Sequence, residues 1–312
     1  MDQSLLVFVT VAEKENFTRA AEELRITQPA VSQYIQTLER MVGTKLLERN
    51  NKYVRLNKAG KIVYHHAKEI LGLYTRMQCL VDDLMHTASG NLSIGASYTY
   101  GEYVLPHIIA HLREQYPLIK PTITIGNTKE IAELVARHQL DIGIVEGDFQ
   151  HEKLHIEPFA EDLMFIIIST NHRYAHRKEI QISELGEETW IVREEGSGTR
   201  EATEKMFAKF QLHPHNIMEF GSTQIIKESV EAGLGITLLS HWAVRKEISM
   251  GTLKVLKING IPVSRKFSFI TQATQFHTKA TEVFLDILRK NEALPELIVH
   301  DSKSNPSKRG SK

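Results

Sequence analysis

Apolar residues recur every three or four positions along the first forty residues, a spacing that predicts amphipathic helices. A first helix carries its apolar stripe at Leu5, Phe8, Val9 and Ala12. A second helix opens near residue 17, and we expect Thr18 to be its N-cap because a threonine hydroxyl can accept a hydrogen bond from the first turn.

A third helix begins at the stretch TQPAVSQYIQTLER, residues 27–40. Thr27 can cap its first turn, where Pro29 is tolerated because its missing N–H would have no partner. Its apolar stripe consists of Val31, Ile35 and Leu38. The opposite side carries amides and a guanidinium in place of the usual Glu and Lys, at Gln33, Gln36 and Arg40. Such side chains pair bidentately with base edges. Two helices joined by a short turn, the second with a polar outer face, form a helix-turn-helix, and the alternative is an ordinary three-helix bundle.

The next twenty residues are strongly basic. The stretch from Arg40 to Lys61, both included, has seven Lys or Arg residues against a single acid, Glu48. Alternating residues on both sides of a turn at residues 50–51 predict a small β-hairpin, which would act as a wing, and basic side chains there suit phosphate contacts. We therefore expect the DNA-binding residues to be Thr27, Gln28, Pro29, Ser32, Gln33, Gln36, Arg40, Arg49, Lys52 and Arg55.

A long helix follows, with Asn57 as its N-cap and an end near residue 88. Its apolar positions alternate spacings of four and three, the a/d pattern of a coiled coil, at Val63, Ala67, Ile70, Tyr74, Met77, Val81 and Leu84. This seam predicts a dimer, and a dimer favours dyad-symmetric DNA. The alternative is a long helix packed on its own domain. We interpret His65 and His66 as a solvated pair, and we expect no metal and no cofactor.

Strands and helices alternate through the remaining two hundred residues. The expected strands are 92–96, 121–126, 140–145, 163–169, 189–193, 217–220, 235–239, 252–258 and 265–271. The expected helices are 102–115, 128–138, 199–210, 223–232 and 277–290. This alternation indicates an α/β fold with a largely parallel sheet. Nine strands suit two small lobes, with the chain crossing between them near residue 160 and returning near residue 267.

Three loops at predicted strand ends are rich in hydroxyl groups, and ligands of open α/β sheets bind at such ends. The residues 196–198, Gly-Ser-Gly, can form an anion-binding nest of N–H groups, beside the guanidinium of Arg200. We therefore expect a small, anionic ligand held by Ser97, Tyr98, Thr99, Asn127, Thr128, Ser197, Gly198, Thr199 and Arg200. The alternative for each loop alone is ordinary helix capping.

Chain length, net charge and cysteine content narrow the functional classes. The chain has 312 residues, a formal net charge of zero and one cysteine, Cys79. No apolar run approaches the ~20 residues that span a bilayer, and the N-terminus lacks the basic region of a secretory signal, so we expect a cytoplasmic protein. The polar end, residues 292–312, is predicted to be disordered.

Enzyme motifs are scarce. Neither a phosphate-binding P-loop nor a dinucleotide-binding glycine motif is present. His172 and His176 have a spacing that could hold zinc, but they lie in a polar connection that is more typical of a solvated loop. We expect no enzyme activity. The alternative is a metabolite-processing enzyme with a DNA-binding head.

The N-terminal sixty residues resemble LysR-type transcriptional regulators almost throughout. The resemblance rests on NFTRAAEEL, TQPAVSQYIQTLE, VGTKLLER and LNKAG; Leu47 and Asn57 stand where the family more often has Phe and Thr. Within the family, GSGTR and IGASYTYGEYVLP are similar to the sulfur-metabolism activators.

The resemblance implies an N-terminal all-α winged helix-turn-helix, a coiled-coil linker helix and a C-terminal α/β two-lobed domain similar to periplasmic binding proteins. The limits we expect are 1–60, 58–88 and 90–291, with lobe I at 90–161 and 268–291, lobe II at 162–267 and a tail at 292–312. The implied partners are promoter DNA, a metabolite bound between the lobes, further copies of the chain in a dimer or tetramer, and RNA polymerase.

Overall fold

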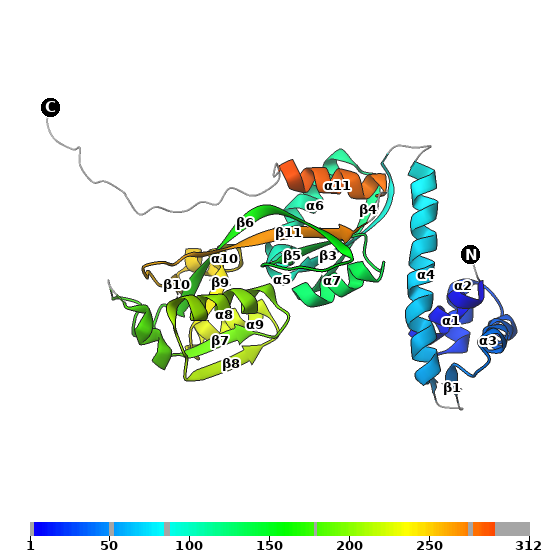
Figure 1. Cartoon of the computed structure of the whole chain (residues 1–312), viewed down its shortest axis with the longest axis horizontal. Helices are drawn as coiled ribbons and strands as arrows, with labels where there is room; N and C mark the ends of the chain where they lie inside the picture. The colour runs from blue at the N-terminus through cyan, green and yellow to red at the C-terminus, as the bar shows by residue number, and fades with distance from the viewer. Residues whose placement is uncertain (1–2, 50–52, 84–87, 178–179, 274–276, 291–312) are drawn as a thin grey trace.

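The computed structural model describes residues 3–49, 53–83, 88–177, 180–273 and 277–290. The chain begins with a helical head formed by α1 (Gln3–Lys14), α2 (Phe17–Leu24) and α3 (Gln28–Val42) (Figure 1). The head has its own buried core, which includes Phe8, Ala21, Val31, Ile35 and Leu38. The three helices predicted from apolar spacing are therefore confirmed.

The N-cap predicted for α2 is wrong. The cap is Asn16, whose Oδ1 accepts from the backbone N–H groups of Thr18 at 2.8 Å and Arg19 at 3.0 Å. Thr18 is thus the second residue of the helix, and its backbone N–H donates to the cap. For α3 the prediction holds, because Thr27 caps it by accepting from Ala30 N–H.

The predicted wing is confirmed as an antiparallel hairpin of β1 (Leu47–Arg49) and β2 (Val54–Leu56), with Leu47 opposite Leu56. Its expected turn at residues 50–51 and Lys52 lie outside the described residues.

The linker helix is α4 (Lys58–Asp83). Asn57 starts it, because its Oδ1 accepts from Gly60 N–H at 2.7 Å. The helix first packs on the head, where Lys68 pairs with Glu13 at 2.7 Å, and farther along it meets the C-terminal domain. There a Cβ on Gly72 would lie 2.7 Å from the carbonyl oxygen of His138. The expected end near residue 88, with Leu84, lies beyond the described part of this helix.

The C-terminal domain is built on a seven-stranded sheet in the order β10-β6-β11-β5-β3-β4, with β9 also paired to β6, and on a separate parallel pair, β7 and β8. The strands are β3 (Gly90–Ser97), β4 (Ile119–Gly126), β5 (Ile142–Glu146), β6 (Leu154–Ser169), β7 (Thr189–Arg193), β8 (Asn216–Phe220), β9 (Thr237–Ser240), β10 (Leu253–Val255) and β11 (Val263–Gln272). The helices are α5 (Tyr98–Tyr103), α6 (Leu105–Gln115), α7 (Thr128–Ala136), η1 (Ile182–Glu187), α8 (Gly198–Phe210), α9 (Thr223–Glu231), α10 (His241–Met250) and α11 (Lys279–Lys290).

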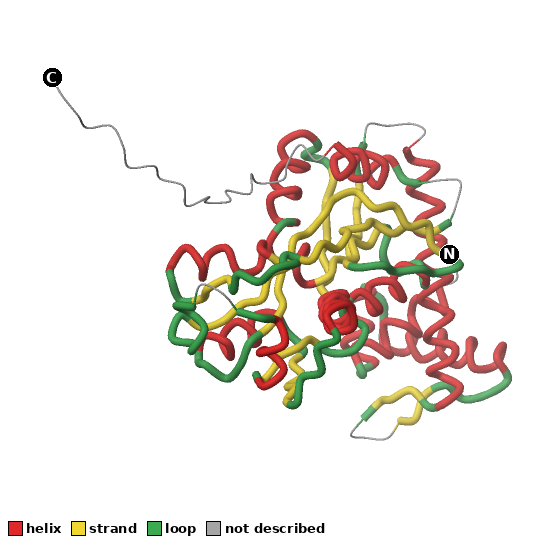
Figure 2. Tube along the Cα trace, turned by 60° about the vertical axis from the view of Figure 1, so that its left-hand side comes forward, coloured by secondary structure: helices red, strands yellow, loops and turns green. Residues whose placement is uncertain are grey.

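Two lobes are confirmed, each with its own core. In lobe I, which is built around β3, β4 and β5, α6 and α11 cover one face of the sheet and α7 the other (Figure 1). Lobe II is built around β7, β8, β9 and β10, with α8, α9 and α10. The long strands β6 and β11 run side by side from one lobe to the other (Figure 2).

The expectation of a largely parallel sheet is wrong. The pairs β3–β4, β3–β5 and β7–β8 are parallel, but β11 is antiparallel to β5 and β6, and β6 is antiparallel to β9 and β10. The physical reason is that β6 leaves lobe I and β11 returns to it, so the two crossing strands run in opposite directions. Four elements were also missed in whole or in part: the first half of β6 from Leu154, most of α5, and all of η1 and α10.

No helix in the described ranges is both long and apolar enough to cross a membrane.

Candidate functional site

The outer face of α3 is open to solvent. Of the residues predicted to contact DNA on this helix and its cap, Ser32 is half-buried, and those exposed are Thr27, Gln28, Pro29, Gln33, Gln36 and Arg40. Gln28 Nε2 donates to Ser32 Oγ at 3.2 Å, which links two of these side chains along the helix. The face can therefore enter a major groove without unburying any core residue.

A buried carboxylate ties the end of α3 to the wing. Glu39 accepts from Lys45 Nζ at 2.7 Å and from the N–H of Leu46 at 3.0 Å. Burial acts to raise the pKa of Glu39, but these hydrogen bonds outweigh it and the pKa is lowered. On the wing Arg55 is exposed and lies over the Tyr53 ring, 5.3 Å from its centroid. For Arg49 the structure describes only the backbone, in β1.

The predicted seam of α4 divides into two parts. Ala67 is buried and Val63 packs against the head, so the first turns belong to the core of the head. Farther along, Ile70, Met77 and Val81 are exposed by 51%, 51% and 58%, Leu73 is also exposed and Tyr74 is half-buried. Ile62, in the first turns, is exposed as well. An isolated helix does not gain stability by exposing such a stripe.

One arginine joins the two lobes. Arg265 lies on β11, and its side chain is almost fully buried. Its Nη2 donates to Thr99 Oγ1 in lobe I at 3.0 Å, and its Nη1 donates to Thr199 Oγ1 in lobe II at 2.9 Å. Both hydroxyls were predicted site residues, and the structure brings them together through a cation that was not predicted.

Two buried carboxylates hold that cation. Glu146 Oε2 lies 2.7 Å from Arg265 Nη1, and Asp162 Oδ2 lies 2.8 Å from its Nε. Burial acts to lower the pKa of Arg265, but the two carboxylates outweigh it and raise it. Burial also raises the pKa of Asp162, against the opposing effect of the guanidinium. The cluster is thus fixed by charges that cannot reach water.

Glu146 also anchors the N-terminus of α5. Its Oε1 accepts from the N–H groups of Thr99 at 2.9 Å and Tyr100 at 3.1 Å. Beside it, Ser97 Oγ and Thr128 Oγ1 lie 3.2 Å apart, and Thr128 donates to the carbonyl of Glu146. These predicted residues therefore form one buried group of hydroxyls at the carboxyl ends of β3 and β5.

The two lobes are in close contact at the predicted loop that contains residues 196–198. A Cβ on Gly198 would lie 2.1 Å from the carbonyl oxygen of Glu146, so only glycine fits there. Ser197 caps α8, as the alternative of ordinary capping requires. Asn127 caps α7 and donates to Glu194 of the facing lobe at 3.4 Å, and Lys129 N–H donates to the carbonyl of Gly196 at 3.2 Å.

Arg200 is not the cation of this cluster, in contrast to our expectation. It donates to Glu204 at 2.6 Å, to Glu219 at 2.8 Å and to the carbonyl of Arg193 at 3.0 Å. The reason is that Arg200 lies in the first turn of α8, within reach of β8. Its neighbour in space, Arg193, is only 1% exposed and lies 4.3 Å from the ring centroid of Tyr98, which is in the opposite lobe.

The two histidine pairs considered in the sequence differ in how well they could hold a metal ion. His65, His66 and Glu69 bring their ligand atoms within 4.8 Å of one another, the one such group in the described residues. His172 pairs with Glu188 at 3.3 Å, and His176 is exposed. The spacing of His172 and His176 therefore gathers no third ligand from the described part of the chain.

Comparison with known proteins gives concordant matches. Residues 3–61 match the model of the bacterial regulatory helix-turn-helix protein, lysR family, and residues 86–293 match the LysR substrate binding domain. The chain is 40% identical over 287 residues to the HTH-type transcriptional regulator CysL of Bacillus subtilis, covering 92% of this chain and 96% of CysL.

Two solved structures are also similar. Full-length OxyR from Pseudomonas aeruginosa is 24% identical, with a TM-score of 0.71 over 93% of this chain and 94% of OxyR. The CcmR regulatory domain of Synechocystis in complex with 2-PG is 27% identical, with a TM-score of 0.60 over 65% of this chain and 97% of that domain.

Proposed function

The chain belongs to the LysR family of transcriptional regulators, and we propose that α3 reads promoter DNA while the cleft between the two lobes binds a small anionic metabolite. The DNA-binding part rests on the exposed amide and guanidinium side chains of α3, with basic residues of the wing beside it. In this arrangement Gln33, Gln36 and Arg40 contact base edges, and Arg49, Lys52 and Arg55 contact phosphates.

The Arg265 cluster is the observation that carries the effector-binding part. It places Thr99 and Thr199, from opposite lobes, on the two terminal nitrogens of one buried guanidinium. The N-termini of α7 and α8 lie at the same edge, and helix N-termini favour anions. The relative with 2-PG in its regulatory domain supports a small ligand for this chain.

The effector would act by changing the angle between the lobes. A ligand anion would accept the O–H protons of Thr99 and Thr199, while Arg265 donates to lone pairs of the same hydroxyls, so its binding would add contacts between the lobes that depend on the angle between them. This change is allosteric only if the two lobe arrangements differ in affinity for the ligand. We propose that the difference reaches DNA through α4.

Dimerisation is the third part of the proposal. The exposed stripe of α4 with Ile70, Met77 and Val81 would pair with the same stripe of a second copy. A symmetric pair presents two copies of α3, which fits a dyad-symmetric operator. We retain the predicted domain limits within this proposal, together with a cytoplasmic location and action without chemical turnover.

A ligand screen tests the effector-binding part. The full-length protein is heated with panels of sulfur, phosphate and carboxylate metabolites, each with its uncharged analogue. We expect an anion to raise the midpoint of unfolding, because ligand bound to the native state stabilises it by mass action. The bound metabolite should then be recovered unchanged by mass spectrometry. If Thr128→Val and Thr199→Val bind it as tightly as wild type, the proposed cleft is wrong.

A further inference from the structure

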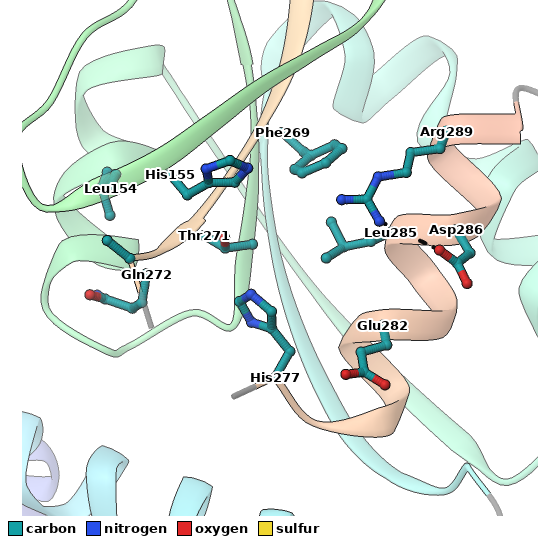
Figure 3. Close-up of a pocket in the computed structure, with 11 residues that line it drawn as sticks. Leu154, His155, Phe269, Thr271, Gln272, His277, Glu282, Leu285, Asp286 and Arg289 are labelled. Carbon is teal, nitrogen blue, oxygen red and sulfur yellow. Dashed lines mark hydrogen bonds and ion pairs between the residues drawn. The ribbon is translucent and has the colours of Figure 1, made fainter. Parts of the chain in front are cut away.

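A cavity lies in lobe I, on the side of β11 that faces α11 (Figure 3). It has a volume of about 790 Å³, which is within the range of sites for small molecules. Its apolar floor consists of Leu154, Phe269 and Leu285, and polar side chains surround it. None of the residues predicted to hold the effector lines it.

A buried hydroxyl group belongs to the wall of this cavity. Thr271 is 1% exposed and lines the cavity, and its Oγ1 has no hydrogen-bond partner among the described residues. A buried hydroxyl without a partner is costly and therefore uncommon. A ligand that offers a hydrogen-bonding group at this point would satisfy it.

The charge of the rim selects the kind of ligand. Arg289 is the guanidinium of the rim, and Glu157 holds it through two hydrogen bonds of 2.8 and 2.9 Å. Glu282 and Asp286 add two further carboxylates, of which Asp286 also pairs with Arg289 at 3.5 Å (Figure 3). Burial lowers the pKa of His277, and the charge of Arg76 lowers it further, so this imidazole is neutral at pH 7. Carboxylates thus outnumber cations, and an anion would be repelled.

We propose that this cavity is a binding site for a small organic cation, an amine with an apolar body. The ammonium group would lie near Glu282 and Asp286 and donate to Thr271 Oγ1, and the apolar body would cover Leu285 and Phe269. The site is distinct from the anion cleft in both position and charge, so the two ligands do not compete.

The position of the site gives it a route to the linker helix. Arg76 of α4 is half-buried against lobe I, where its charge acts on His138, Asp141 and His277. His277 is therefore a residue of the cavity wall on which the charge of Arg76 in α4 acts. A ligand that fixes His277 changes the packing of the linker helix on lobe I; this consequence rests on the proposed function, whereas the site itself does not.

Calorimetric titration of the full chain tests the site, with benzylammonium as the probe and benzoate and benzyl alcohol as its anionic and neutral counterparts. We expect saturable binding of benzylammonium. Benzoate should show no binding that benzylammonium can displace. Glu282→Gln should weaken binding at least tenfold and Thr271→Val at least fivefold. Glu114→Gln removes the same charge from an exposed site on α6 and should bind like wild type.

Two controls keep the result decisive. Thr271→Val removes a hydroxyl that has no partner in the described structure, so the midpoint of unfolding should not fall. Thr199→Val alters the proposed effector cleft and should leave benzylammonium binding unchanged, which separates the two sites. Equal binding of benzylammonium by wild type, Glu282→Gln and Thr271→Val, or no binding by wild type, would overturn the proposal.

Discussion

Arg265 and Asp162 form a buried ion pair of 2.8 Å between the two strands that connect the lobes. Replacement by Arg265→Met would leave the carboxylates of Asp162 and Glu146 buried without their cation. Removing one partner of a buried pair costs about 3–5 kcal/mol, so we expect the free energy of unfolding in urea to fall by that amount. Arg265→Lys, which keeps a positive charge, should show a smaller fall in the free energy of unfolding.

The loss in Arg265→Met should depend on pH. Burial already raises the pKa of Asp162, and the variant lacks the guanidinium that opposes this rise. The folded state then binds a proton that the unfolded state, with a carboxyl pKa of about 3.9, has released. The deficit relative to wild type should therefore grow as pH rises from about 3.9 to the raised pKa of Asp162, stay constant above it, and shrink as pH falls back toward the unfolded value. A deficit independent of pH would contradict this account.

Gly198→Ala should separate the lobes. The new Cβ would lie 2.1 Å from the carbonyl oxygen of Glu146, and backbone atoms must move to admit it. Overpacking of this kind costs about 1–3 kcal/mol, and we expect a lower midpoint of unfolding with weaker effector binding. The matched control is Gly221→Ala, where no atom lies within 4 Å of the added Cβ. Equal stability of both variants would refute close contact at Gly198.

Arg193 and Arg200 should differ in effector binding. Both guanidinium groups have carboxylate partners, Glu194 for Arg193 and Glu204 and Glu219 for Arg200. Arg193, however, is buried and lies against Tyr98 of the opposite lobe, whereas Arg200 is 24% exposed and bonds only within lobe II. Losing one charge-assisted hydrogen bond costs roughly 1.5–3 kcal/mol, so Arg193→Met should weaken binding of the metabolite found in the screen about ten- to a hundredfold. Arg200→Met should change it less than about threefold. The reverse order in calorimetry would restore Arg200 as the anion-binding residue.

Gln33 and Arg55 should affect DNA binding differently. Gln33→Ala removes a base-edge contact and should reduce the ratio of specific to random binding. Arg55→Ala removes a phosphate contact, so affinity should fall on all sequences and the salt slope should decrease by about one. Mobility shifts over a range of salt concentrations measure both effects. An equal loss on specific and random DNA for both variants would show that this division of roles is wrong.

Met77→Lys should prevent dimerisation. Met77 is 51% exposed in the single chain, so the charge harms only an assembly that buries it. Met250→Lys is the matched control, since Met250 is 68% exposed at the end of α10. Sedimentation should show a smaller species for Met77→Lys alone, with operator affinity lost in parallel. An unchanged assembly would remove the α4 stripe as the dimer contact.

Local patterns in the sequence were enough to predict the helical head, the wing and the hydroxyl groups at strand ends. Val31 and Ile35 repeat with helical spacing, and Thr99 and Thr128 follow apolar runs. These signals lie within a few residues of each other, and so they can be read without knowing the tertiary structure.

Long-range pairings could not be predicted in this way. Arg265 bonds to residues 66, 103 and 166 positions away, and no local pattern identifies such partners. The first half of β6 was missed because Pro158 and its charged neighbours resemble a loop. For α10, Ser240 is the cap, but the apolar residues 242–244 follow a buried strand directly and hide the start of the helix.

The pairing of β6 with β11 limits how the lobes can move. Sliding or splaying the strands would break their ladder of hydrogen bonds, whereas twisting the ribbon about its long axis preserves it. Their register is irregular between Phe267 and Ser268, which lie opposite Ala160 and Pro158 and leave Phe159 as the extra residue. Such bulges increase local twist. We therefore expect the lobes to move relative to each other by torsion of the β6–β11 ribbon near Phe159. An effector would then rotate one lobe about the long axis of the ribbon rather than close the cleft by hinge bending.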